Sequence, residues 1–233
     1  MIVLQSVTKS YGDVNAVDDV TLVISRGEFA FLMGENGAGK TTILRLISRE
    51  EKPDAGIVLV AGGNTAELSG TALTRMRRRL GVVYQDTRLL PNSTVTENVA
   101  LPLRVRGEGG AALDDDVHAV LERVSLADKR ARFPAELSGG EQRKVAIARA
   151  VVARPEILLC DEPTESLSAD RAEEIVDLLL DINSDGVTTV VATHDLSTVN
   201  RLRRRVIYMD CGRVQSDTPV GSVPVSQTLV KPA

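Results

Sequence analysis

The order of apolar and polar residues divides the chain into three stretches. In the first, short β-type runs between glycine-rich and charged turns predict strands at residues 2–7, 20–24, 28–33, 57–60 and 81–84. From about residue 85 to 153, apolar residues recur three and four positions apart, which predicts helices, among them 114–124 and 140–153. Beyond Pro155, strands expected at 157–160, 188–193 and 206–210 alternate with helices expected at 169–182 and 196–202. Such alternation is typical of a parallel sheet covered by helices.

This pattern predicts a single α/β domain that spans residues 1–233. We expect its core at about 1–85 and 155–215, with a helical lobe inserted at about 86–154. Residues 216–233 contain Pro219, Pro224 and Pro232 and show no periodicity, so we expect a loosely attached tail and assign it no function.

Composition narrows the classes of protein. Hydrophobic residues make up 43% of the chain and charged residues 26%, the mixture of a globular domain. We find neither an apolar stretch long enough to cross a bilayer nor a basic start followed by an apolar run, so we expect a cytoplasmic protein. Cys160 and Cys211 are too few for a disulfide framework or zinc site, and we interpret both as reduced and structural.

The charge balance argues against nucleic acid as a partner. The net charge is -4, and the basic clusters at 75–79 and 201–205 lie in a chain with only 3% aromatic residues. We therefore interpret both clusters as solvated helix faces, although the second could contact lipid headgroups if a membrane partner is present.

A glycine-rich segment follows the apolar strand expected at 28–33 and opens a helical run. It has the spacing G-x-x-x-x-G-K-[ST], formed by Gly34, Glu35, Asn36, Gly37, Ala38, Gly39, Lys40 and Thr41. Glycines let successive backbone N–H groups surround a phosphate, and Lys40 supplies a mobile positive charge. Thr41 would place its hydroxyl on Mg²⁺, and Thr42 could donate to a phosphate oxygen. A plain glycine turn is the alternative, but this spacing seldom arises by chance.

Two acids end the apolar strand expected at 157–160. Asp161 can hold the Mg²⁺ that Thr41 contacts, and Glu162 can polarise a water aimed at a γ-phosphate. The alternative is a strand that ends in solvated acids, which the phosphate loop elsewhere in the chain makes the weaker interpretation.

Residues 137–142 read Leu-Ser-Gly-Gly-Glu-Gln and precede an expected helix. Ser138 is a suitable N-cap, and the two glycines leave the start of the helix open to an anion. Capping alone would account for Ser138 and Glu141. It does not account for Gly139 and Gly140 in a chain with a phosphate loop, an acid-ended strand and His194 after a third strand.

Together these motifs resemble the nucleotide-binding subunits of ABC ATPases over nearly the whole chain. The resemblance implies a P-loop NTPase fold with a parallel-sheet core, an antiparallel β subdomain and an inserted helical subdomain. It implies ATP hydrolysis with ATP and Mg²⁺ bound. In that family the LSGGE segment of one subunit closes on the ATP of another, so a homodimer should form on ATP binding, with Ser138, Gly140 and Glu141 facing the nucleotide.

The resemblance assigns further roles residue by residue. Tyr11 corresponds to the aromatic that stacks on adenine, and Gln85 to the glutamine that faces both Mg²⁺ and the membrane partner. His194 corresponds to the γ-phosphate sensor and acts beside the catalytic Glu162 and Lys40. Taken singly, Tyr11 could be a surface turn aromatic, Gln85 a solvated strand end and His194 a structural histidine.

Segments 46–53, 81–91 and 94–103 are most similar to the cell-division branch of the family, which works with the membrane protein FtsX. This implies a transmembrane FtsX-like subunit docked near Gln85 and residues 86–103, a peripheral position on the inner face of the membrane, and an indirect link to cell-wall hydrolases. ATPases of lipoprotein-release or macrolide exporters share much of the third segment and remain an alternative.

Another alternative is an ATP-sensing regulatory module that hydrolyses weakly. It rests on Ser168, which stands where the family usually has an aspartate in its dimer-contact loop. A hydroxyl carries no charge, so we expect weaker coupling between subunits and slow basal turnover.

Overall fold

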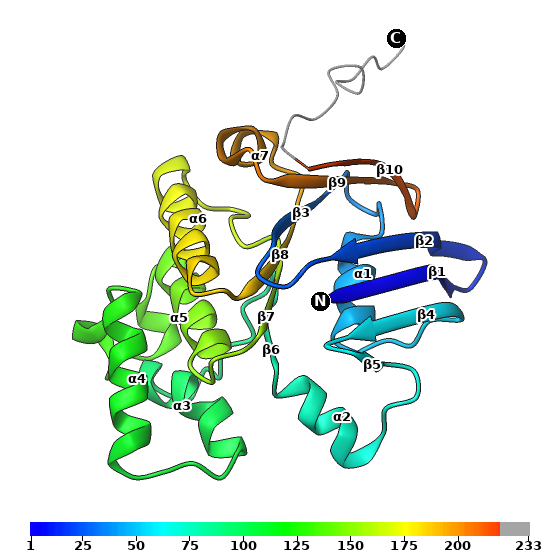
Figure 1. Ribbon diagram of the computed structural model, residues 1–233. Helices are drawn as coiled ribbons and strands as arrows, with labels where there is room; N and C mark the ends of the chain where they lie inside the picture. Colours follow the sequence, from blue (N-terminus) through cyan, green and yellow to red (C-terminus); the bar gives the residue numbers. More distant parts are fainter. Residues whose placement is uncertain (220–233) are drawn as a thin grey trace.

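The computed structural model describes residues 1–219 and consists of two β-sheets with helices packed around them (Figure 1). Residues 220–233, most of the expected tail, lie outside the described part of the chain. The antiparallel sheet lies on one side of the six-stranded sheet, and helices α3 to α6 gather on the other (Figure 1).

The smaller sheet is antiparallel throughout and has the strand order β2-β1-β4-β5. Its strands are β1 (Ile2–Tyr11), β2 (Val14–Ile24), β4 (Ala55–Val60) and β5 (Gly63–Asn64). Two of them extend beyond the apolar runs at 2–7 and 20–24, because their outer ends pair with each other through register shifts. This sheet is the antiparallel β subdomain that the resemblance implies.

The larger sheet has the order β10-β9-β3-β8-β7-β6 and is parallel except for its edge strand β10. Its strands are β3 (Phe29–Met33), β6 (Leu80–Val83), β7 (Ile157–Asp161), β8 (Thr188–Thr193), β9 (Arg205–Asp210) and β10 (Arg213–Thr218). The predicted parallel sheet is therefore confirmed. Every residue of β3, β7 and β8 is buried, as in parallel strands covered on both faces.

The helices are α1 (Lys40–Ile47), α2 (Gly70–Arg77), α3 (Val95–Val105), α4 (Ala111–Arg123), α5 (Gly139–Val151), α6 (Ala169–Ser184) and α7 (Leu196–Leu202), with 3-10 turns η1 (Ala127–Lys129) and η2 (Pro134–Glu136). Between β6 and β7 the chain forms only helices and turns, as its periodicity predicts. None of the helices within residues 1–219 is long and apolar enough to cross a membrane.

Two hydrophobic clusters lie on opposite faces of the larger sheet, and alternate residues of β3 point into each. Phe29 and Phe31 pack with the helical side, their rings 5.2 Å apart edge to face. Ala30 and Leu32 point the other way, into a cluster with α1 and the antiparallel sheet. Because both faces are covered, the strand ends next to α1 are held rigidly.

The structure differs from the expectation at the start of the tail. Residues 216–218 complete β10, which pairs with β9. Arg205 on β9 adds hydrogen bonds of 2.8 and 2.6 Å to the Asp217 carboxylate. The sequence of these residues shows no alternation of apolar and polar positions, because a polar edge strand has one face in solvent. Pairing with the neighbouring strand stabilises the strand instead.

We expect Phe31→Ala to lower the free energy of unfolding by about 3–5 kcal/mol, because it leaves a cavity at the centre of the larger sheet. Chemical denaturation of the purified chain measures this change. Val14→Ala is the matched control: Val14 is 67% exposed, and its loss should change stability by less than about 0.5 kcal/mol. Equal effects of both substitutions would contradict the described core.

Candidate active site

Functional residues gather where the parallel strands of the larger sheet end. The glycine-rich loop follows β3, Asp161 ends β7, His194 follows β8, and Gln85 lies just beyond β6. Because neighbouring parallel strands end at the same edge of a sheet, residues far apart in sequence meet there. The fold thus brings together most of the residues that the motifs single out.

The glycine-rich loop surrounds the Lys40 side chain, which is only 6% exposed. The ammonium donates to the Gly34 carbonyl at 2.7 Å and to the Glu35 carbonyl at 3.2 Å. A Cβ at Gly34 would lie 2.3 Å from the Met209 carbonyl oxygen on β9, and one at Gly39 would lie 2.3 Å from the Ala16 carbonyl oxygen on β2. Glycine is therefore required at both positions for the loop to close over the sheet.

A cavity of about 370 Å³ adjoins this loop. It is lined by Tyr11, Ala16, Asn36, Gly37, Ala38, Gly39, Lys40, Thr41, Thr42, Gln85 and Glu162. Tyr11, the predicted adenine-stacking residue, ends β1 and is 43% exposed, so its ring is available at the cavity's rim. The cavity combines backbone N–H groups, a buried cation and an accessible aromatic ring, the groups that a nucleotide requires.

Thr41 and Asp161 are in direct contact. The Thr41 hydroxyl donates to Asp161 Oδ1 at 3.0 Å. Burial raises the pKa of the Asp161 carboxyl, and the neighbouring Glu162 adds to the rise while the Thr41 hydrogen bond opposes it. A hydroxyl and a carboxylate are oxygen ligands of the kind that Mg²⁺ prefers.

Glu162 is buried and has strained backbone geometry, with φ of 45°. Its Oε1 lies 3.0 Å from His194 Nδ1 and 3.3 Å from Lys40 Nζ. No donor within residues 1–219 meets hydrogen-bond geometry at this buried oxygen. Glu162 Oε1 is thus held between the Lys40 ammonium and the His194 imidazole and retains the capacity to accept a hydrogen bond from another molecule.

The Gln85 side chain donates from Nε2 to Glu165 Oε2 at 2.6 Å. The backbone just before it is also fixed: the buried Arg143 donates from Nη1 to the Tyr84 carbonyl at 2.8 Å. Both Gln85 and Glu165 line a second cavity of about 430 Å³, which runs along α1 toward Glu50 and Arg88. Gln85 therefore connects the cavity beside the glycine-rich loop with a groove on the surface.

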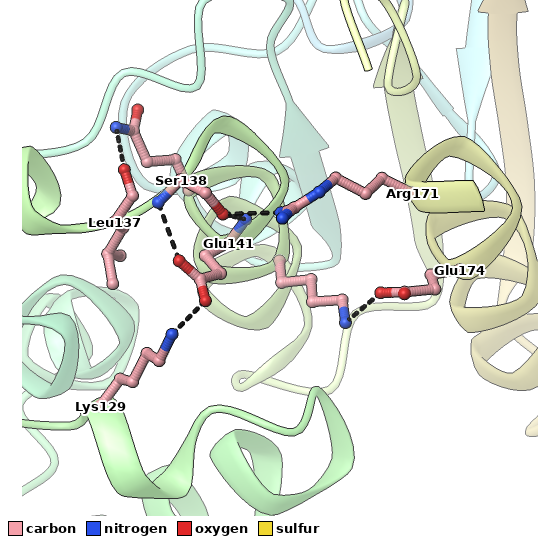
Figure 2. Close-up of polar contacts among 8 residues, drawn as sticks. Lys129, Leu137, Ser138, Glu141, Arg171 and Glu174 are labelled. Carbon is pink, nitrogen blue, oxygen red and sulfur yellow. Dashed lines mark hydrogen bonds and ion pairs between the residues drawn. The ribbon is translucent and has the colours of Figure 1, made fainter. Parts of the chain in front are cut away.

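Ser138, Gly140 and Glu141 lie elsewhere, at the N-cap and in the first turn of α5, and none of them lines the cavity beside the glycine-rich loop. Figure 2 shows their contacts: Ser138 Oγ caps the helix, and the Glu141 carboxylate accepts from the Ser138 backbone N–H at 2.8 Å. Lys129 pairs with Glu141 and, with that N–H, lowers the pKa of the Glu141 carboxyl to about 2. Glu141 is thus ionised and committed to the cap.

The motifs did not indicate several residues that the structure adds to the site. These are Ala16, whose backbone covers Gly39, the buried Arg143, and Glu165. Each acts through a contact between segments distant in the chain, so spacing carries no signal for it. Only Arg143 has a hint in the sequence, since helical spacing places it on the same face of α5 as the apolar Ala146 and Ile147.

Comparisons with known proteins agree with this geometry. Residues 17–165 match the family described as ABC transporter. Cell division ATP-binding protein FtsE of Mycobacterium tuberculosis is 44% identical over 95% of this chain and 97% of its own length. Methionine import ATP-binding protein MetN of Brucella abortus is 37% identical over 98% of this chain and 64% of its own.

Among solved structures, the dimeric ATP-binding cassette MJ0796 in a post-hydrolysis state with ADP and Pi superposes with a TM-score of 0.87. It is 37% identical, and the match covers 96% of this chain and 100% of that one. The chain therefore belongs to the ABC transporter ATPase family. It has the P-loop NTPase fold of that family, binds ATP and is an ATP hydrolase.

The pairing of His194 with Glu162 predicts a measurable pH dependence. The close contact with the Glu162 carboxylate raises the pKa of the His194 imidazole above its ordinary 6.5, more than burial lowers it. A raised folded-state pKa means that the pair stabilises the fold fully below pH 6.5, and that this contribution is lost as the pH rises through the folded-state pKa.

Titration of the nucleotide-free protein by NMR should give a raised pKa for His194, and Glu162→Gln should lower it toward the ordinary value. His118, an exposed histidine on α4, supplies the internal reference signal in both proteins. An unchanged His194 titration would show that the pair does not form in solution.

Proposed function

We propose that this cavity binds Mg-ATP and that Glu162 activates the water that cleaves the γ-phosphate. The observation that supports this most directly is the position of Glu162 Oε1, buried between Lys40 and His194 at the same sheet edge as the Thr41–Asp161 pair. Cation, carboxylate and oxygen ligands thus surround one cavity, as phosphoryl transfer requires.

Residues of the loop and its rim hold the nucleotide in this proposal. Residues 34–39 direct backbone N–H groups at the phosphates, with Thr42 adding its hydroxyl. Hydrogen bonds to two loop carbonyls already position the Lys40 ammonium. On binding, it replaces these bonds with bonds to phosphate oxygens, which carry more negative charge. Tyr11 stacks on the adenine from the rim of the cavity.

Mg²⁺ fits the oxygen donors next to the loop. Thr41 and Asp161 would hold it, and Gln85 lies within reach of the same cavity. No group of three or more His, Cys, Asp or Glu side chains within residues 1–219 could enclose a metal alone, which agrees with an ion held partly by phosphates. When bound, Mg²⁺ would neutralise charge on the phosphate oxygens.

Glu162 and His194 would carry the hydrolytic step. Glu162 Oε1 accepts a hydrogen bond from the attacking water and takes its proton as the water oxygen bonds to the γ-phosphorus. The bond from the γ-phosphorus to the β–γ bridging oxygen breaks in the same step, and ADP leaves with that oxygen. The Glu162 contact raises the pKa of the His194 imidazole, and the protonated imidazole would stabilise charge on the γ-phosphate. When ATP binds, Gln85 gives up its hydrogen bond to Glu165 and turns toward the bound nucleotide. This movement transmits the presence of ATP to the groove.

The remaining predicted contacts require a second copy of the chain. Ser138, Gly140 and Glu141 do not line the nucleotide cavity of their own subunit, whereas the MJ0796 cassette is described as dimeric. We therefore propose a homodimer that forms on ATP binding, in which each first turn of α5 covers the ATP of the other subunit. Ser138 and the Gly140 N–H would contact the γ-phosphate, while Glu141 keeps the turn in shape.

Glu162→Gln should lower kcat for ATP hydrolysis by about two to four orders of magnitude while ATP still binds, since a general base contributes about that much. Steady-state phosphate release and binding of a fluorescent ATP analogue measure the two quantities. Glu122→Gln, an exposed acid on α4, is the control and should retain full turnover. Lys40→Ala should instead abolish binding; normal ATP binding by that variant would show that the cavity is misassigned.

Relatives support a role in cell division. Proteins called FtsE are 40–44% identical over 95% of the chain. We propose that the dimer drives a transmembrane FtsX-like subunit and, through it, controls cell-wall hydrolases from the inner face of the membrane. The groove of about 430 Å³ between α1 and residues 84–88 supports docking of that subunit, because Gln85 lines both the groove and the nucleotide cavity.

Transport is the second candidate role. The similarity to MetN covers 98% of this chain, so the same domain and site would serve an ABC transporter equally well. An exporter of the lipoprotein-release or macrolide type belongs to this candidate. An ATP-sensing module with weak hydrolysis rests on Ser168 alone, which is exposed and makes no side-chain cap bond at the start of α6.

Co-purification from native membranes separates these roles. Glu162→Gln protein with ATP should retain its membrane partner longest, because the closed dimer persists, and mass spectrometry identifies that partner. We expect an FtsX-like subunit to be enriched over the same preparation with Lys40→Ala protein. Recovery of a transporter permease would contradict the division role and leave the site intact, and absence of any membrane protein would favour the regulatory module.

A further inference from the structure

Arg171, in the first turn of α6, reaches across to the Ser138 hydroxyl on α5 (Figure 2). Its Nη1 donates to Ser138 Oγ at 2.7 Å. The side chain crosses Gly140 closely: a Cβ at Gly140 would lie 3.1 Å from Nη1 and 3.2 Å from Cδ of Arg171. The guanidinium thus lies directly beside the groups proposed to contact the γ-phosphate of a second subunit.

The contact determines which way the Ser138 hydroxyl donates. Ser138 Oγ accepts from Arg171 and, at 3.4 Å, from the Glu141 backbone N–H. A hydroxyl has two acceptor sites and one proton, so its O–H must point away from both donors. The Ser138 hydroxyl is therefore prepared to donate to an incoming acceptor such as a phosphate oxygen.

The charge of Arg171 is not explained by an ion pair or by stabilisation of α6. Within residues 1–219 no carboxylate lies within ion-pair distance of it; Glu174, further along α6, is bound to Lys144 at 2.7 Å. A cation in the first turn of a helix also opposes the helix dipole. The side chain is exposed, so its remaining N–H groups can reach another molecule.

We propose that Arg171 is an additional ATP-binding residue, which acts beside Ser138 on the γ-phosphate held by the partner subunit. This rests on the proposed ATP-bound homodimer. One N–H of the guanidinium keeps Ser138 oriented, and the others donate to phosphate oxygens in the planar geometry that suits arginine. The positive charge of Arg171 would also offset the negative charge of the γ-phosphate at the interface between the two subunits.

The test measures ATP-dependent dimerisation of the full chain in the Glu162→Gln background by analytical ultracentrifugation. Arg171→Ala should raise the ATP concentration for half-maximal dimer by about tenfold or more, as loss of a charge-assisted bond implies. Arg171→Lys should recover part of the loss, and Arg171→Gln should not. Lys144→Gln is the matched control, because it removes a neighbouring cation that already has a carboxylate partner.

A double-mutant cycle separates direct contact from mere orientation of Ser138. If Arg171 contacts the phosphate itself, Arg171→Ala should still weaken dimerisation in a Ser138→Ala protein; no further effect there would overturn the proposal. Binding of fluorescent ATP to the monomer should be unchanged, which verifies that the variants fold. If Arg171→Ala protein dimerises as well as its parent, the role of Arg171 is refuted and the proposed homodimer is not. If the Glu162→Gln parent itself does not dimerise with ATP, the proposed homodimer is refuted.

Discussion

The buried contact between Lys40 and Glu162 is the interaction on which the rest of the site depends. An ammonium and a carboxylate, exposed by only 6% and 8%, lie 3.3 Å apart at the end of the central strands. Buried charges are costly unless they are paired, so each holds the other in place. His194, which directly follows β8, also contacts Glu162. The same proximity places the proposed base beside the cation that the proposal directs at phosphate.

The two hydrophobic clusters make this arrangement rigid. Helices on one face and α1 with the antiparallel sheet on the other bury the central strands on both sides. Strand ends therefore cannot shift relative to each other without opening a core, and the loop after β3 stays in register with Asp161 at the end of β7. Packing far from the cavity thus sets distances within it.

Each subunit presents its functional groups on two separate surfaces. One is the cavity beside the glycine-rich loop, which Gln85 connects to the groove along α1. The other is the first turn of α5, where Ser138 is bound by Arg171 and stabilised by the cap from Glu141. Such a division suits an enzyme that couples ATP occupancy to association, because a complete site would exist only between two subunits.

Much of the site follows from local sequence, because the phosphate loop, Asp161 and Glu162 lie within short motifs whose backbone geometry is set by glycines and a strand end. Periodicity likewise predicted the parallel sheet and helical segment. Sequence could not indicate that Gln85 binds Glu165, that Arg171 binds Ser138, or that β10 continues past residue 216. Those contacts join polar residues of distant segments, and only the packing of strands and helices brings them together, since a polar residue carries no periodic signal of its partner.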